Sequence, residues 1–178
     1  LTAEAQPVEL VDKIVGGVRL IDTIVEDMLA FTRAQTPELV ELPLAGVVAA
    51  AVDQVTPRLE RQQCRLASEA LPEGCAPRVE ADHNLLMRAF VNVMLNAAEA
   101  MEPSGGGTVS VSIYEDAEAG EVRLAFRDEG PGVSEDSLPR LFDPFYTTRD
   151  RGIGLGLSIV HRIVEDHHGK VEVSNPEG

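Results

Sequence analysis

The stretch from residue 108 to residue 126 sets the strongest limit on the fold. Residues 108–114 alternate strictly between polar and apolar side chains and residues 121–126 do so approximately, a pattern typical of strands with one buried face. Residues 116–120 between them are short enough to form a hairpin loop, so the two strands are predicted to pair antiparallel. The apolar face of such a pair requires a second layer of structure to cover it.

Helical segments on both sides of the hairpin are expected to supply this layer. The sequence predicts helices over residues 44–61, where Pro57 is expected to kink or shorten the helix, over residues 82–101, and over residues 155–167. Asp82 is a good N-cap for the second of these helices. The fold class is therefore α+β, a two-layer α/β sandwich with a mixed sheet packed on helices. Further extended segments are expected at residues 40–42, 65–68, 78–81 and 170–174.

The first 36 residues have a different pattern. Apolar positions recur four and three residues apart, as on a helix that packs lengthwise against another helix. So wide an apolar stripe is not stable alone in water, so we expect partner helices outside this sequence; one amphipathic helix lying on the following domain is the alternative. Thr36-Pro37 ends the helix. The apolar row consists of Leu10, Ile14, Gly17, Ile21, Ile24, Met28 and Phe31.

Composition excludes several kinds of partner. Thirty acidic residues against 15 basic ones give a net charge of −15, which argues against a broad surface for nucleic acid or anionic lipid. No apolar run approaches the roughly 20 residues of a membrane-spanning helix. The spacing of Cys64 and Cys75 fits neither a zinc site nor a redox pair, so reduced thiols and a cytoplasmic location are expected.

Two asparagines stand out on the helix predicted over residues 82–101. Asn92 and Asn96 are one helical turn apart and therefore share a face. A carboxamide oxygen can bind a hard divalent cation without adding negative charge. Hydrogen bonding of both amides to neighbouring backbone is the alternative interpretation of this pair.

Three further clusters follow in the sequence. Asp128-Glu-Gly-Pro-Gly132 comes directly after a strand, where glycines allow backbone to approach a flat ligand and a carboxylate can accept a hydrogen bond from an amine. Residues 141–149 combine aromatic side chains with hydroxyls and a cation. Residues 152–157 form a glycine-rich loop that opens into a helix, a junction that suits phosphate. This loop lacks the features of a P-loop and of a Rossmann turn.

In this order the four clusters resemble the N, G1, F and G2 boxes of the ATP-binding catalytic part of two-component sensor histidine kinases. These kinases share an ATPase superfamily with gyrase, the Hsp90 chaperones and the MutL proteins. The resemblance covers residues 37–175, and residues 16–31 resemble the second helix of the dimerisation and phosphoacceptor hairpin. It implies a hairpin helix over residues 1–36 and a catalytic domain over residues 37–178. The first hairpin helix and a last sheet strand are expected to lie outside this sequence.

The resemblance also implies the role of each site residue. Mg²⁺ is expected at Asn96, with Asn92 assisting or facing the triphosphate, and Asp128 is expected to accept the adenine amino hydrogen. Thr148, Arg149 and the backbone of residues 152–156 are expected to form a mobile lid. The expected catalytic residues are Asn92, Asn96 and Arg149. Residues expected to contact ATP are Asn92, Asn96, Asp128, Gly130, Gly132, Phe145, Thr147, Thr148, Arg149, Gly152, Gly154, Leu155 and Gly156.

Some residues depart from the family pattern. Glu129 stands in place of the usual Asn and Ile153 in place of the usual Thr, both beside the site, where they are candidates for weakening nucleotide affinity. Arg149 replaces the usual Lys and keeps a charge suited to phosphate. Asn92 stands where hydrolysing relatives carry a glutamate that activates water, and an amide cannot serve as that base. Phosphoryl transfer is therefore expected rather than hydrolysis.

The resemblance implies transfer to a histidine that this chain does not contain. None of His83, His161, His167 and His168 lies in an acceptor motif, so each is expected to be a surface or capping residue. The implied partners are ATP, the phosphoacceptor helix of the same kinase, a response regulator and a second copy of the chain. Two alternatives remain open: a nucleotide-regulated interaction module that has lost transfer, and a serine kinase of the anti-sigma type, which the apolar row in the first 36 residues disfavours.

Overall fold

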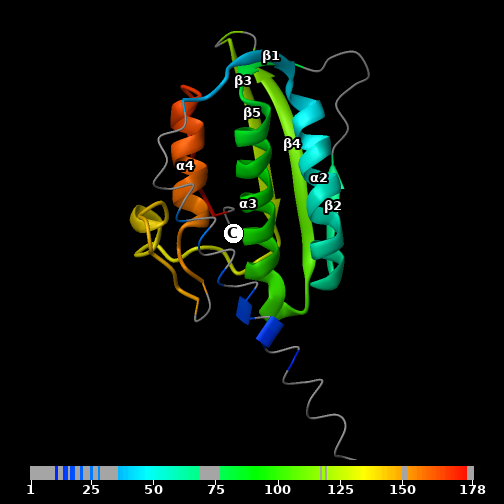
Figure 1. The fold of residues 1–178 in the computed structure, drawn as a ribbon, viewed down its shortest axis with the longest axis vertical. Coiled ribbons are helices and arrows are strands. Elements are labelled where there is room, and N and C mark those ends of the chain that lie inside the picture. The colour runs from blue at the N-terminus through cyan, green and yellow to red at the C-terminus, as the bar shows by residue number, and fades with distance from the viewer. Residues whose placement is uncertain are drawn as a thin grey trace, which may run out of the picture.

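The computed structural model describes residues 36–68, 77–116, 118, 120–149 and 152–175, together with residues 11, 14, 15, 17, 18, 21, 25 and 28. Figure 1 gives the element labels used below. The helices are α2 (Leu44–Arg61), α3 (His83–Met101) and α4 (Gly156–Asp166), with short 3₁₀ turns η1 (Glu102–Ser104) and η2 (Leu138–Arg140). The strands are β1 (Val40–Pro43), β2 (Cys64–Ser68), β3 (Arg78–Ala81), β4 (Gly107–Asp116) and β5 (Glu121–Asp128).

The long hairpin expected from the alternation is present. β4 and β5 pair antiparallel from Val109 opposite Asp128 to Asp116 opposite Glu121. β2 joins the other edge of β4 in parallel, which makes a mixed three-stranded sheet in the order β2-β4-β5. β1 and β3 form a separate antiparallel pair.

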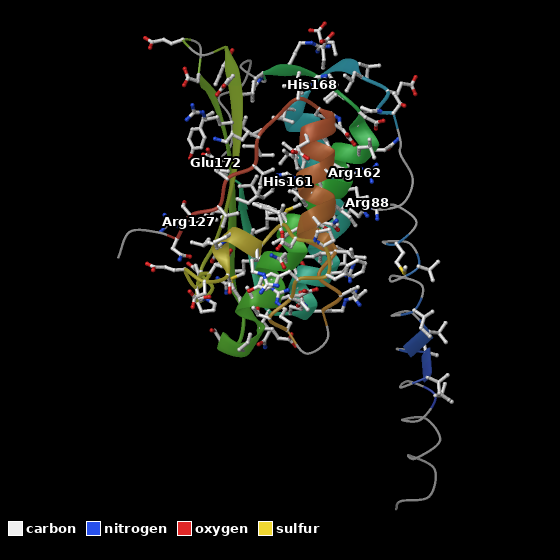
Figure 2. The ribbon with its side chains drawn as sticks, turned by 90° about the vertical axis from the view of Figure 1, so that its left-hand side faces the viewer. Arg88, Arg127, His161, Arg162, His168 and Glu172 are labelled. Atoms are coloured by element: carbon white, nitrogen blue, oxygen red, sulfur yellow. The ribbon has the colours of Figure 1, made fainter. Side chains whose placement is uncertain are left out.

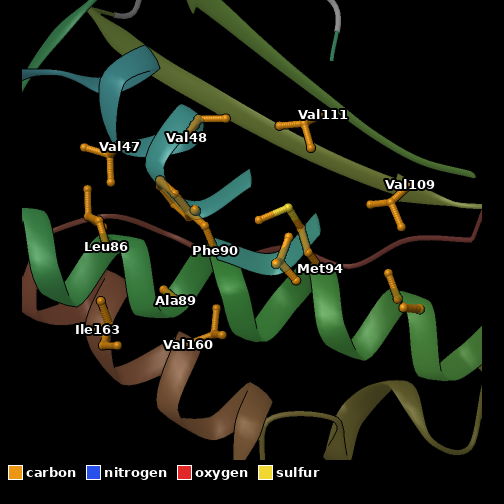
Figure 3. Close-up of a cluster of buried hydrophobic side chains, with 14 of the residues drawn as sticks. Val47, Val48, Leu86, Ala89, Phe90, Met94, Val109, Val111, Val160 and Ile163 are labelled. Carbon is orange, nitrogen blue, oxygen red and sulfur yellow. The ribbon is translucent and has the colours of Figure 1, made fainter. Parts of the chain in front are cut away.

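The helices lie side by side over one face of the strands, with α3 in the middle (Figure 1). Side chains of α3 reach both neighbouring layers: Phe90 and Met94 lie below Val109 and Val111 of β4, and Ala89 lies against α4 (Figure 3). All of these side chains are buried, and burying them is the main stabilising contribution of the two layers. The predicted α+β sandwich is confirmed, and α3 is its central element.

Asp82 caps α3 as expected. Its Oδ1 accepts hydrogen bonds from the N–H groups of Asn84 and Leu85 at 2.9 and 3.1 Å, and its Oδ2 accepts one from Glu38 N–H at 3.1 Å. The Asp82 N–H itself donates to His167 Nε2 at 2.9 Å. The start of α3 is thereby tied both to the chain before β1 and to the end of α4.

Two predicted features differ in the structure. Residues 170–174 form no strand: this segment, which includes Glu172, passes beside β5 (Figure 2), but no backbone hydrogen bond joins it to that strand in the described part of the chain. Its contacts come from side chains, such as the ion pair of Lys170 with Glu172, and a strand requires a backbone ladder. α2 runs through Pro57 to its predicted end, because Val55 and Leu59 on either side of the proline are buried in the core.

The described residues of the N-terminal segment are helical, and their large apolar side chains are exposed. Ile14 and Ile21 are 57% and 59% exposed and Met28 is 48% exposed. Leu10, Ile24 and Phe31 of the predicted row lie outside the described residues, so the hairpin helix over residues 1–36 and the domain boundary after it stay predictions. Where the structure describes helices, none is long and apolar enough to span a bilayer.

Candidate functional site

Two of the sequence clusters contact the C-terminal half of α3, which itself carries Asn92 and Asn96. The guanidinium of Arg149 contacts Glu99 and the backbone of Asn96 on that helix. A Cβ placed on Gly130 would lie 3.4 Å from the Cβ of Ala100. The turn after β5 and the segment of residues 141–149 therefore border the same part of one helix, and the glycine-rich loop is joined to that segment by backbone hydrogen bonds.

Asn92 and Asn96 are both half-buried on α3. The Asn92 Nδ2 atom is buried and has no hydrogen-bond partner, and no hydrogen bond of the Asn96 side chain occurs within the described residues. The alternative interpretation, that neighbouring backbone satisfies both amides, is therefore wrong for the Asn92 Nδ2 group. A buried unpaired donor costs about 1–3 kcal/mol, and this one lies one helical turn before Asn96.

The turn after β5 holds Asp128 in a fixed orientation. Asp128 Oδ1 accepts a hydrogen bond from the N–H of Gly130 at 2.8 Å, while Oδ2 makes no hydrogen bond within the described residues. Gly132 has a φ of +76°, a conformation that favours glycine. The turn therefore presents one carboxylate oxygen as an available acceptor.

The far end of this turn is held by Asn175, which the sequence reasoning missed. Its Oδ1 accepts from Val133 N–H at 2.8 Å and its Nδ2 donates to Val133 O at 2.6 Å, so one amide side chain satisfies both backbone groups of Val133. The two residues are 42 positions apart, and no local sequence signal links them.

The two departures from the family pattern beside the site lie against the protein itself. Glu129 Oε2 accepts a hydrogen bond from Thr108 N–H at the start of β4, at 2.8 Å. Ile153 is partly buried and packs against the hydrophobic core. Both side chains therefore have structural contacts of their own.

The segment of residues 141–149 and the glycine-rich loop are joined by their backbones. Phe145 N–H donates to Gly154 O at 2.9 Å. Gly154 has a φ of +73°, and a Cβ there would lie 2.6 Å from the carbonyl carbons of Phe145 and Tyr146. Only glycine fits this approach, so we treat residues 145–149 and 152–154 as one unit, called the lid segment from here on.

A polar cluster holds the lid segment on its outer side. Tyr146 Oη donates to Ser137 Oγ at 2.9 Å, and Ser137 also bonds Ser134 at 2.7 Å. The Arg140 guanidinium lies 4.5 Å from the centre of the Tyr146 ring, a cation–π contact. Sequence reasoning did not identify this cluster, because Tyr146 and Ser137 are paired only by the fold.

Arg149 connects the lid segment to α3. Its Nη1 lies 2.5 Å from Glu99 Oε2, and its Nη2 donates to Asn96 O at 3.0 Å. Its own N–H donates to Thr147 Oγ1 at 3.1 Å, while Thr148 is exposed. Glu99 was not among the predicted site residues, although its position three residues after Asn96 places it on the same helix face.

α4 begins without a side-chain cap. Leu155 occupies the N-cap position, is buried, and makes no capping hydrogen bond. A Cβ on Gly156, the first helical residue, would meet nothing within 4 Å. The first-turn N–H groups and the positive end of the helix dipole are thus available to an anion. Gly152, at the other end of the loop, donates to Arg149 O at 3.4 Å.

The histidines have structural contacts or lie exposed. The Nδ1 of His161 lies 3.2 Å from Glu165 Oε2, and its ring lies against the Phe142 ring. The Nδ1 of His167 lies 2.6 Å from Ile163 O, and its Nε2 accepts a hydrogen bond from Asp82 N–H. His83 is exposed at the start of α3. Among the residues that the structure describes, no group of three His, Cys, Asp or Glu side chains is arranged to hold a metal ion, so any divalent cation here would depend on amide oxygens and on its ligand.

Comparison with known proteins identifies relatives of this chain. Residues 81–178 match the sequence profile of the family described as histidine kinase-, DNA gyrase B-, and HSP90-like ATPase. The C4-dicarboxylate transport sensor protein DctS of Rhodobacter capsulatus is 36% identical over 163 residues, which are 90% of this chain and 24% of DctS. The chain thus spans about a quarter or less of the length of its first curated relatives.

Two solved structures share the fold over almost the whole chain. Full-length ShkA in complex with AMPPNP superposes with a TM-score of 0.70 at 28% identity, covering 93% of this chain and 35% of ShkA. Histidine kinase ThkA in complex with the response regulator protein TrrA superposes with a TM-score of 0.70 at 25% identity, covering 95% of this chain and 47% of that structure's chain.

Proposed function

The chain belongs to the histidine kinase-, DNA gyrase B- and HSP90-like ATPase family, and we propose that it binds Mg-ATP between α3 and the lid segment and transfers the γ-phosphoryl group to a histidine on another helix. The observation that carries the proposal is the buried, unpaired Nδ2 of Asn92, one helical turn before Asn96, whose backbone oxygen binds Arg149. An amide donor at this place would pair with a phosphate oxygen when nucleotide binds.

The chain's polar groups suit the parts of a nucleotide. The available oxygen of Asp128 would accept the adenine amino hydrogen, and Gly130 and Gly132 would lie under the base. Thr148, Arg149 and the first-turn N–H groups of α4 would bind phosphate oxygens. Asn96 would supply an amide oxygen to Mg²⁺, which, when bound, neutralises charge on the phosphate oxygens.

The same residues favour transfer over hydrolysis. The Asn92 amide cannot accept a proton from water, so it does not supply a general base on α3 at this position. Positioning of the acceptor and the nucleotide would then provide most of the rate enhancement.

The acceptor is proposed to be the first helix of the dimerisation hairpin, in the same kinase. The exposed apolar side chains of Ile14, Ile21 and Met28 support this part of the proposal, because a partner helix would bury them. A second copy of the chain would complete the hairpin bundle as a homodimer. A response regulator, the kind of protein bound to ThkA in its solved complex, would receive the phosphoryl group afterwards.

Incubation with radioactive ATP, with and without a separate fragment carrying the acceptor helix, tests the transfer step. We expect no label on this chain alone and acid-labile label on the added fragment. Acid-stable label would support the serine kinase alternative. ATP binding with a bound but unlabelled fragment would support an interaction module that has lost transfer, and acid-labile label on this chain alone would identify one of its own histidines as an acceptor.

Calorimetry with ATP and GTP tests the base contact separately. Guanine presents a carbonyl oxygen where adenine presents an amine, so a guanine covering the exposed Asp128 carboxylate would place two acceptors face to face, at a cost of about 1–3 kcal/mol. We expect the unmutated chain to bind ATP about 10- to 100-fold more tightly than GTP and Asp128→Ala to lose this preference. Equal binding of both nucleotides by the unmutated chain would contradict the role of Asp128.

A further inference from the structure

The contact between Arg149 and α3 fixes the guanidinium group on two sides. Nη1 is paired with the Glu99 carboxylate at 2.5 Å, and Nη2 donates to the backbone oxygen of Asn96 at 3.0 Å. Two bonds from the two ends of a planar group determine its orientation, which a single ion pair does not. A guanidinium has five N–H donors, so the remaining donors are still available to another partner.

This contact differs from the other bonds of the lid segment. The bond between Phe145 and Gly154 lies within the segment and does not determine where the segment sits relative to α3. Tyr146 attaches it to Ser137, which precedes η2 and is not part of α3. Glu99 and Arg149 are 50 residues apart in the chain, and their pairing ties the segment directly to the helix that carries Asn92 and Asn96.

Exposure and backbone contacts indicate how strong the attachment is. The Arg149 and Glu99 side chains are 33% and 45% exposed, and an isolated ion pair at such a place contributes little. Here the pair is combined with the bond to Asn96 O and with the bond of Arg149 N–H to Thr147 Oγ1 at 3.1 Å. Side chain and backbone of Arg149 are therefore held together, and a movement of Arg149 moves the lid segment.

We propose that Glu99 is a positioning residue that docks Arg149, and with it the lid segment, onto α3 before nucleotide binds. A segment that is already docked does not have to be ordered during binding, which reduces the entropic cost of association. What the segment would cover rests on the proposed function, whereas the docking itself concerns only contacts within this chain.

Hydrogen exchange on the nucleotide-free chain tests the docking. In Glu99→Ala we expect the amides of Phe145, Arg149 and Gly152 to exchange about three- to tenfold faster, because the segment opens more often. The amide of Ile159 in α4, bonded to Leu155 O, should be unchanged. Glu60→Ala is the matched control, since Glu60 is an exposed glutamate on α2. Unchanged exchange of the lid amides, or equal acceleration in both variants, would overturn the proposal.

A double-mutant cycle measured by ATP titration tests whether Glu99 acts through Arg149. Glu99→Ala should weaken ATP binding about three- to tenfold, and adding it to Arg149→Ala should cause no further loss. An equal loss in both backgrounds would show that Glu99 acts independently of Arg149. Tighter ATP binding by Glu99→Ala would show that Glu99 competes with phosphate for Arg149, and either result would overturn the proposal.

The two measurements separate this inference from the proposed function. If the unmutated chain does not bind ATP, the proposed function fails, while the exchange rates of the nucleotide-free chain still decide whether Glu99 docks the lid segment.

Discussion

The N-termini of α3 and α4 are opposite solutions to the same problem. Every α-helix begins with N–H groups that have no partner within the helix. At α3 the Asp82 carboxylate accepts from Asn84 and Leu85, and the helix start is closed. At α4 the N-cap residue is Leu155, whose side chain points into the core and caps nothing.

The difference shows that one fold can close one helix start and leave another open. A capping carboxylate satisfies the first-turn N–H groups permanently and would repel a second anion at the same place. An uncapped helix start preceded by glycines keeps these groups available, at a cost to stability that the buried Leu155 and Ile159 offset. The start of α3 is therefore closed by its cap, whereas the start of α4 is open and, under the proposed function, would bind phosphate.

The largest expected effect is on ATP affinity. Asn96→Ala should reduce ATP affinity in the presence of Mg²⁺ about 100-fold, to its level without the metal, because the proposed amide ligand is lost. The free energy of unfolding of the variant should stay within about 0.5 kcal/mol of that of the unmutated chain, since the Asn96 side chain makes no hydrogen bond within the described residues. ATP titrations with Mg²⁺ and with a chelator check this. A metal dependence equal to that of the unmutated chain would exclude Asn96 as a ligand.

The closed terminus should respond in the opposite way. Asp82→Ala should lower the free energy of unfolding by about 1–2 kcal/mol, because the α3 cap is lost, and leave ATP affinity unchanged. Urea denaturation and calorimetry measure the two quantities. Weakened ATP binding without loss of stability would contradict the purely structural role of the α3 start.

The stabilisation by Asp82 should also depend on pH. Burial raises the pKa of this carboxyl, but the N–H groups of Leu85, Glu38 and Asn84 and the nearby His167 together lower it below 3.8. A lowered folded-state pKa gives stability that is present above the unfolded value and is lost as the pH falls through the folded value. The difference in unfolding free energy between the unmutated chain and Asp82→Ala should therefore be full at about pH 6 and shrink below about pH 3.8.

Asn92→Ala tests the unpaired amide. Removing a buried donor that has no partner should raise the free energy of unfolding by about 1 kcal/mol, helped by the higher helix propensity of alanine, while ATP affinity falls. Thermal denaturation measures the expected rise in stability, and ATP titration of the same preparation measures the expected fall in affinity. A loss of stability would show that the amide has a structural role instead.

The smallest effect sharpens the comparison at α4 itself. Gly156→Asp places a carboxylate in the first turn, where there is room for a side chain, and should stabilise the helix by about 0.3–1 kcal/mol. The same charge should weaken ATP binding about two- to fivefold. Gly156→Ala is the control, because it adds helix propensity without charge. If the two variants bind ATP equally well, the start of α4 is not a phosphate site.

Local patterns in the sequence determined most of the secondary structure and placed the proposed site residues on it. The β4–β5 hairpin follows from the two-residue periodicity, and the start of α3 follows from Asp82, because both signals depend on neighbours in the chain. Two of the four clusters likewise lie in loops that contact α3, because their residue types suit the backbone conformation and the polar contacts needed there. The positive φ of Gly132 is one example.

The partners of these residues were decided only by the tertiary structure. Glu99 with Arg149 and Asn175 with Val133 join positions 50 and 42 residues apart, and no local pattern specifies such pairs. Residues 170–174 also show that a local pattern does not specify a partner, because a strand was predicted there and the segment has no backbone partner among the described residues. Periodicity reports which face of a segment is buried, whereas a hydrogen bond depends on where the fold places the second group.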